Sequence, residues 1–197
     1  MCIRDRSENH EILLIGVHGS ESRGYEWVYP LQTLDTPETL TLFFRWNDKK
    51  CPGPSYEKLY SSIDSLLQLN ANLKEVVVIG HSYGALLVSM FLSEWSKDTP
   101  LAVHAIAGPL AGMPSINSLC LYNPPNLINN NVKFYEWRTI QALDGAFRDL
   151  NYDPQIVEIK KSAVTRLPET YKGNKLGHNW SISWVADEIK KTNQYQD

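Results

Sequence analysis

The chain has 197 residues, of which 43% are hydrophobic and 21% are charged, which is the balance of an ordinary globular protein. Its formal net charge is −3 and it has no basic run or stripe, which argues against nucleic acid as its main partner. No apolar run is long enough to cross a bilayer, so we expect no transmembrane helix.

Strand and helix patterns alternate along the chain and predict a doubly wound α/β fold. Most strand-like runs are continuously apolar, as expected when helices cover both faces of a parallel sheet. The predicted strands are Ile12–Val17, Thr41–Trp46, Glu75–Gly80, Leu101–Ala107, Val132–Trp137 and Gln155–Lys160, the last two toward an edge. The predicted helices are Ser55–Leu69, Tyr83–Ser96, Gln141–Asn151 and Asn179–Lys191. We therefore expect one mostly parallel sheet of about six strands with helices on both faces.

An irregular stretch, Gly108–Asn131, separates two of the predicted strands and is rich in Gly, Pro and Asn. A long loop inside a compact domain is usually functional or mobile. This one is unusually apolar for a loop. It either packs a small core of its own or forms a wall of an acyl-binding cleft, and the sequence leaves both interpretations open.

The N-terminus and the cysteines are less informative about function. Residues 1–8 carry no secretory signal and begin like a translated sequencing adapter from environmental DNA, so we expect them to be disordered or an assembly artefact. A cytoplasmic location is the default expectation, although an altered start would hide a signal peptide. We expect residues 9–197 to form a single, monomeric domain. Cys2, Cys51 and Cys120 have no metal-ligand spacing and predict no disulfide framework, and Cys51 is interpreted as a packing or surface residue.

A motif with chemical meaning lies between the third predicted strand and the second predicted helix. Residues 80–84 read Gly-His-Ser-Tyr-Gly. A G-x-S-x-G sequence in a strand-turn-helix setting predicts a nucleophile elbow, in which Ser82 is held in a strained conformation with its hydroxyl exposed. The motif alone also arises by chance, and an ordinary loop serine is the other interpretation.

A nucleophilic serine needs a base to take its proton and a carboxylate to orient that base. The chain order in this class of sites is Ser, then acid, then His, and only two of the five histidines follow the elbow. His104 lies within a predicted strand. His178 lies in a loop that enters the last helix, where its ring can reach the top of the sheet, so His178 is the candidate base.

The acid is expected just beyond the predicted strand Val132–Trp137. Asp144 fits best, because it lies in a turn soon after this strand and ahead of His178 in the chain. Asp149 and Asp153 are rivals, although helix capping, turn formation or solvation explains each of them equally well.

The tetrahedral intermediate of acyl transfer needs N–H donors aimed at its oxyanion. One donor is expected from the backbone of Tyr83, which follows the nucleophile, and the second from Ser20 in the loop after the first strand. His18 is interpreted mainly as a residue that braces this loop. The candidates for contact with the substrate are His18, Glu21, Tyr25, Leu110 and Met113, with the last two on the acyl side.

Taken together, His18-Gly19-Ser20, residues 80–84, Asp144-Gly145 and Gly177-His178 resemble the α/β-hydrolase superfamily, and the resemblance covers residues 11–191. The chain length and the lack of a large inserted cap look like the small, lid-poor serine lipases and esterases. The resemblance implies hydrolysis of carboxylic esters through an acyl-enzyme, with neither a metal nor an organic cofactor. The chain departs from the family pattern in one respect: its expected oxyanion loop, residues 19–24, is polar and lacks a long run of glycines.

The resemblance leaves several activities open. A small-molecule ester with a short or medium acyl chain is the expected substrate, without interfacial activation. Thioesterases, amidases and acyltransferases use the same constellation of residues, because the shape of the cleft selects the leaving group. A non-catalytic binding protein of the same fold belongs to a different class. Such proteins often lose one triad member, whereas all three candidates are present here.

Overall fold

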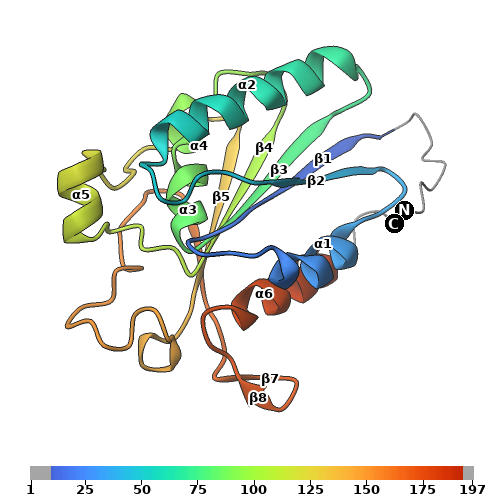
Figure 1. The fold of residues 1–197 in the computed structure, drawn as a ribbon. Helices are drawn as coiled ribbons and strands as arrows, with labels where there is room; N and C mark the ends of the chain where they lie inside the picture. Colours follow the sequence, from blue (N-terminus) through green and yellow to red (C-terminus); the bar gives the residue numbers. More distant parts are fainter. Residues whose placement is uncertain (1–9, 193–197) are drawn as a thin grey trace.

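The computed structural model of the protein describes residues 10–192. Six strands, all parallel, form one sheet in the order β2-β1-β3-β4-β5-β6 (Figure 1). They are β1 (Ile12–Val17), β2 (Thr39–Phe44), β3 (Glu75–His81), β4 (Leu101–Ile106), β5 (Val132–Arg138) and β6 (Ala163–Arg166). The predicted parallel sheet is therefore confirmed. The expectation for residues 1–8 concerns a segment outside the described residues.

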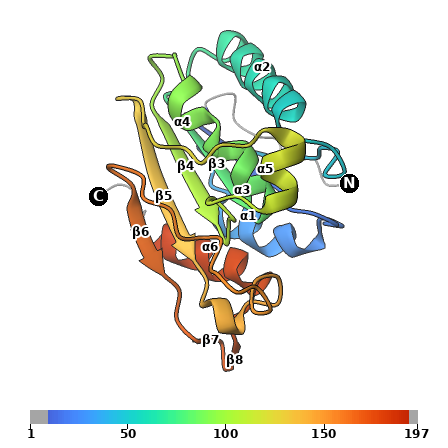
Figure 2. The same ribbon diagram turned by 90° about the vertical axis from the view of Figure 1, so that its left-hand side faces the viewer.

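Helices cover both faces of this sheet (Figures 1 and 2). One face carries α2 (Gly53–Leu69), α3 (Tyr83–Ser89) and α4 (Phe91–Glu94), and the other carries α1 (Val28–Leu34) and α6 (Trp180–Thr192). Successive side chains of a strand point to opposite faces, so Val76 and Val78 of β3 pack under α2–α4 while Val77 and Ile79 pack under α1 and α6. This explains why the central strands read as continuous apolar runs.

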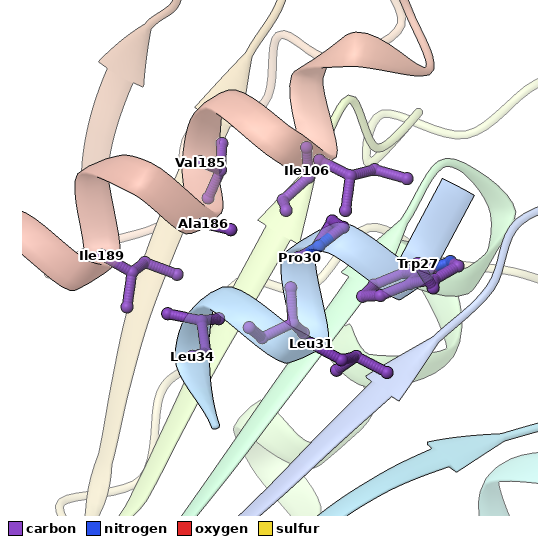
Figure 3. A pocket seen from close by; sticks show the side chains of 10 residues that line it. Trp27, Pro30, Leu31, Leu34, Ile106, Val185, Ala186 and Ile189 are labelled. Carbon is purple, nitrogen blue, oxygen red and sulfur yellow. The ribbon is translucent and has the colours of Figure 1, made fainter. Parts of the chain in front are cut away.

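The packing between α1, α6 and the sheet is closed. Figure 3 shows Leu31 and Leu34 of α1 facing Val185 and Ile189 of α6, with Ile106 of β4 beneath them. The space between these side chains has a free volume of about 0 Å³, too small for a single water molecule. This interface is therefore a second hydrophobic core rather than a ligand site.

The edge of the sheet differs from the sequence prediction. The strand expected at Gln155–Lys160 is wrong, because β6 is Ala163–Arg166 instead. The side chain of Gln155 pairs with the backbone of Thr139, just beyond β5. Its amide oxygen accepts from the N–H of Thr139 at 2.8 Å, and its amide nitrogen donates to the carbonyl of Thr139 at 3.0 Å. All four residues of β6 are exposed, so this strand lacks the apolar alternation that would have revealed it.

The helix expected at Gln141–Asn151 is also wrong. Only a single 3-10 turn, Gln141–Leu143, forms there, followed by further turns. The amide of Gln141 donates to the carbonyls of Leu150 and Tyr152, at 2.9 and 2.8 Å, and so fastens the segment as a compact loop. Asp144 points inward from this loop and is fully buried.

Other boundaries shift, and several short elements are new. The helix expected over residues 83–96 is divided at Met90 into α3 and α4, and β2 begins two residues earlier than predicted, at Thr39 rather than Thr41. Elements that the sequence did not predict are η1 (Tyr25–Trp27), α1, α5 (Pro114–Cys120) and the hairpin of β7 (Thr170–Tyr171) with β8 (Asn174–Lys175). Across residues 10–192, no helix is long and apolar enough to span a membrane.

The irregular stretch 108–131 contains α5, and a disulfide between Cys51 and Cys120 ties this helix to the loop after β2. The two Cα atoms lie 5.4 Å apart although 69 residues separate the cysteines in sequence. Interpreting Cys51 as an unbridged packing or surface residue was therefore wrong, because only the fold brings it beside Cys120. Figure 2 shows α5 in front of α3, at the carboxyl end of the sheet.

Candidate active site

Ser82 lies at the tip of a sharp turn between β3 and α3. Its backbone has φ 54° and ψ −121°, a conformation that non-glycine residues rarely adopt. The turn is held by the N–H of Ser82, which donates to the carbonyl of Ile106 at 2.9 Å. Strain of this kind persists only where the surrounding structure imposes it, and it is characteristic of functional sites.

The glycines around Ser82 are required by close approach. A Cβ atom at Gly80 would lie 2.5 Å from the carbonyl oxygen of Gly84, and one at Gly84 would lie 2.4 Å from that of His18. A Cβ atom at Gly19 would lie 2.8 Å from the Cβ of Ser82. The loop after β1 therefore rests directly against the turn that carries Ser82, which brings Ser20 to the same place.

His178 and Asp144 form a hydrogen-bonded pair. His178 lies just before α6, and its Nδ1 is 2.9 Å from the Asp144 carboxylate. As Nδ1 donates this bond, Nε2 of a neutral ring remains free to accept a proton. Ser82 and His178 line the same small cavity. The arrangement brings together a serine, an imidazole and a carboxylate.

The environment of Asp144 favours its ionised form. Burial alone would raise its pKa, but hydrogen bonds from His178, Thr139 and Ala146 outweigh burial and hold the pKa below its usual value. The Thr139 hydroxyl donates to one carboxylate oxygen at 2.5 Å, and the N–H of Ala146 donates to the other at 2.8 Å. Asp144 is therefore a fixed carboxylate that can orient and stabilise an imidazolium.

His81 is a member of the site that the sequence did not reveal. Its Nε2–H donates to the backbone carbonyl of His178 at 3.1 Å, and the centres of the two rings are 4.6 Å apart. Burial, and then the nearby charge of His178, lower the pKa of His81 to about 3. His81 is thus a neutral donor that fixes the loop carrying His178. Only its place beside Ser82 in the motif could have pointed to this role.

The two residues expected to supply oxyanion donors, Ser20 and Tyr83, are both near Ser82. Tyr83 is the first residue of α3, so its N–H has no partner within the helix. Ser20 lines the cavities on both sides of Ser82. Behind them, His18 braces the loop, because its Nδ1–H donates to the Gly19 carbonyl at 2.7 Å and its Nε2 accepts from the N–H of Trp46 at 3.1 Å.

Two cavities meet at Ser20 and Ser82. The smaller, of about 80 Å³, is polar, and the residues around it are Gly19, Ser20, Glu21, Ser22, Arg23, Tyr25, Glu26, His81, Ser82, His178 and Asn179. The larger, of about 470 Å³, is more open, and its apolar wall consists of Tyr83, Pro109, Met113, Ile116, Leu119, Ala146 and Phe147. In the stretch 108–131, Leu110 and Ile128 belong to the main core beneath α2–α4 and not to a separate core, while Met113 lines the larger cavity. That this cavity binds an acyl chain stays a prediction.

The predicted substrate contacts divide accordingly. Glu21 and Tyr25 line the smaller cavity, and Met113 lines the larger one. His18 and Leu110 line neither of them, since each is only 2% exposed and is packed behind the cleft. Their direct contact with a substrate therefore has no support from these cavities and stays a prediction.

The rival acids and the rival base lie in other surroundings. The carboxylate of Asp149 is 3.6 Å from the guanidinium of Arg148, and that of Asp153 pairs with Arg166 at 3.2 Å. His104 is buried and accepts a hydrogen bond from the indole N–H of Trp137 at 3.1 Å. None of the three lines either cavity beside Ser82.

Comparisons with known proteins bear on the fold. No family model matches the sequence, and a search of curated proteins finds no match. Solved structures do match. The chain is similar to Est1E from Butyrivibrio proteoclasticus at 15% identity and a TM-score of 0.62, with 93% of this chain and 87% of that chain covered.

Two further structures match over most of their length. A lipase-esterase related protein from Clostridium acetobutylicum is 13% identical with a TM-score of 0.59, covering 94% of this chain and 96% of that one. The esterase Pf2001 from Pyrococcus furiosus is 16% identical with a TM-score of 0.54, covering 94% and 81%. At such identities the likeness establishes architecture and not reaction. The parallel sheet, its strand order and these matches together show that the chain has the α/β-hydrolase fold.

Proposed function

We propose that the protein is a serine hydrolase that cleaves carboxylic esters with short or medium acyl chains through an acyl-enzyme. The observation that carries the proposal is the hydrogen-bonded pair of His178 and Asp144, which shares a cavity with the strained Ser82. A serine hydroxyl becomes an effective nucleophile only beside such a base. The structural matches named as esterases favour the same class of reaction.

In the proposed first half-reaction, Ser82 Oγ attacks the ester carbonyl while His178 Nε2 takes the hydroxyl proton. The carboxylate of Asp144 holds the imidazole in the required tautomer and stabilises the imidazolium. The N–H groups of Ser20 and Tyr83 receive the oxyanion. Donors of this kind typically lower the barrier by about 3–4 kcal/mol each.

The tetrahedral intermediate then collapses, and His178 gives its proton to the leaving alcohol. Water enters the vacated position, His178 takes one of its protons, and the hydroxide attacks the acyl-enzyme carbonyl. When the second intermediate collapses, His178 returns this proton to Ser82 Oγ, the carboxylic acid leaves, and the serine hydroxyl is restored. The proposed cycle uses only side chains and backbone groups of this chain, and it needs neither a metal nor an organic cofactor.

The test is hydrolysis of p-nitrophenyl esters of increasing acyl length, from acetate to palmitate, by wild type and by Ser82→Ala. We expect kcat/KM to peak at a short or medium acyl chain and to be lost in Ser82→Ala. Ser93→Ala, on α4 and outside both cavities, is the matched control and should retain activity. Equal activity of wild type and Ser82→Ala would contradict the proposal.

A further inference from the structure

The two cavities beside Ser82 differ in chemistry, and this difference restricts the substrate. The smaller cavity is lined almost entirely by polar side chains, among them Ser22, Arg23 and Glu26. The larger one carries Met113, Ile116 and Phe147. An ester has two arms, one on each side of the attacked carbon, so the question is which arm enters which cavity.

His178 settles the orientation, provided that the proposed function holds. The imidazolium must protonate the leaving oxygen, so the alcohol arm lies on the same side as the ring. His178 lines the smaller, polar cavity and is absent from the lining of the larger one. The alcohol arm therefore belongs in the polar cavity, and the acyl arm belongs against the apolar wall.

The volume of the polar cavity limits the size of the alcohol. A water-sized group needs roughly 10–15 Å³ of such space, so about 80 Å³ holds about five to eight non-hydrogen atoms. A longer chain or a large aromatic group would extend out of this space, which is partly open to solvent. The space fits a short alcohol with three or four carbon atoms and additional polar groups.

The charges around the cavity indicate a neutral alcohol. Glu21 pairs with Lys49 at 3.4 Å, which offsets its charge, and the lining also carries one further carboxylate, Glu26, and one cation, Arg23. Glu26 accepts a hydrogen bond from the Ser22 hydroxyl, which in turn accepts from the N–H of Gly24 at 3.1 Å. Hydrogen-bond donors and acceptors thus alternate without a dominant charge, a pattern that suits hydroxyl groups.

We propose that the protein hydrolyses medium-chain esters of a small, neutral, multiply hydroxylated alcohol, and that Glu26 is the principal specificity residue for that alcohol. Its carboxylate accepts a hydrogen bond from a hydroxyl of the alcohol and is held in place by Ser22. Hydrogen bonds to a charged group discriminate strongly, because a substrate without the hydroxyl leaves that group unpaired.

The test compares esters that share one acyl chain: glycerol monooctanoate, ethyl octanoate and octanoylcholine. We expect wild type to cleave the glycerol ester with a kcat/KM about ten- to hundredfold above that of the ethyl ester. Glu26→Ala should reduce this ratio toward one, and Ser22→Ala should reduce it less. Glu57→Ala, an exposed carboxylate on α2, is the matched control and should leave the ratio unchanged.

The outcomes separate this inference from the proposed function. Cleavage of ethyl octanoate with no preference for the glycerol ester overturns the inference and leaves the hydrolase proposal standing. A ratio that persists in both Glu26→Ala and Ser22→Ala, each folded by circular dichroism, overturns the role of Glu26. Preference for the cationic choline ester overturns the neutral alcohol. No cleavage of any ester overturns the proposed function itself.

Discussion

The floor and the walls of the cleft are built differently. The floor consists of Ser82, Asp144 and His178, which are fixed by hydrogen bonds at the carboxyl edge of the sheet. The walls are the loop 19–26 and the stretch around α5. An exposed ion pair between Glu21 and Lys49 holds the first, and a disulfide holds the second. The sheet therefore positions the groups proposed for catalysis, and the walls determine which ester arms fit. Changes to the floor should abolish turnover, whereas changes to the walls should alter selectivity.

The largest effect is expected at Asp144, in the floor of the cleft. In Asp144→Asn the neutral amide replaces the charged carboxylate that accepts the Nδ1–H bond from His178. The imidazole is then no longer held in the tautomer in which Nε2 is free to accept a proton. We expect kcat on p-nitrophenyl butyrate to fall by about 10⁴ with little change in KM. Asp149→Asn, whose side chain is exposed beside Arg148, is the control and should be unaffected. A loss of less than tenfold in Asp144→Asn would remove Asp144 from the mechanism.

A smaller effect is expected where wall and floor touch. In Gly19→Ala the new Cβ would lie 2.8 Å from Ser82 Cβ and 2.9 Å from the carbonyl of His81, so the loop with Ser20 must move away. Losing one oxyanion donor typically lowers kcat by about 10²–10³. Gly53→Ala is a matched control, since its Cβ would meet nothing within 4 Å. Full activity in Gly19→Ala would mean that this loop does not contribute an oxyanion donor.

Removing the disulfide tests the wall around α5 without changing any residue of the floor. Replacing both Cys51 and Cys120 by Ser opens a closed loop of 69 residues, which in the chain-entropy model lowers the free energy of unfolding by about 4 kcal/mol. Because α5 lines the larger cavity, the preference for octanoate over acetate esters should also change, by up to about tenfold. Urea titrations with and without dithiothreitol measure the first effect. Reductant should leave the double variant unchanged, and an effect on it would point to another cause.

The last prediction concerns stability and not turnover. Burial lowers the pKa of His81 and of His104 to about 3, whereas an unfolded histidine titrates near 6.5. The unfolded chain therefore binds more protons in this range, and stability should fall as pH drops from about 6.5 toward 3, by up to about 1.4 kcal/mol per pH unit for each ring. His104→Gln, which keeps an acceptor for Trp137, should flatten this slope. An unchanged slope would mean that His104 is protonated in the folded protein.

Much of the sheet was predictable from the sequence, because β1, β3 and β4 are buried on both faces and read as unbroken apolar runs. The G-x-S-x-G turn was also predictable, because its spacing and its position between a strand and a helix can be read directly from the sequence. What escaped prediction depends on distant partners. β6 is exposed on both faces and has no alternating apolar pattern, Cys51 meets Cys120 only in the fold, and His81 donates to the carbonyl of His178. The last two are contacts between residues far apart in the sequence, which no local sequence pattern can reveal.

The central claim is that Ser82 is the nucleophile of the cleft. Its most direct test is intact-mass spectrometry after incubation with a fluorophosphonate, which reacts with activated serines. We predict one phosphonate adduct per chain in the wild type and none in Ser82→Ala, with Ser93→Ala labelled like the wild type. An adduct that persists in Ser82→Ala, or a wild type that is never labelled, would contradict the account.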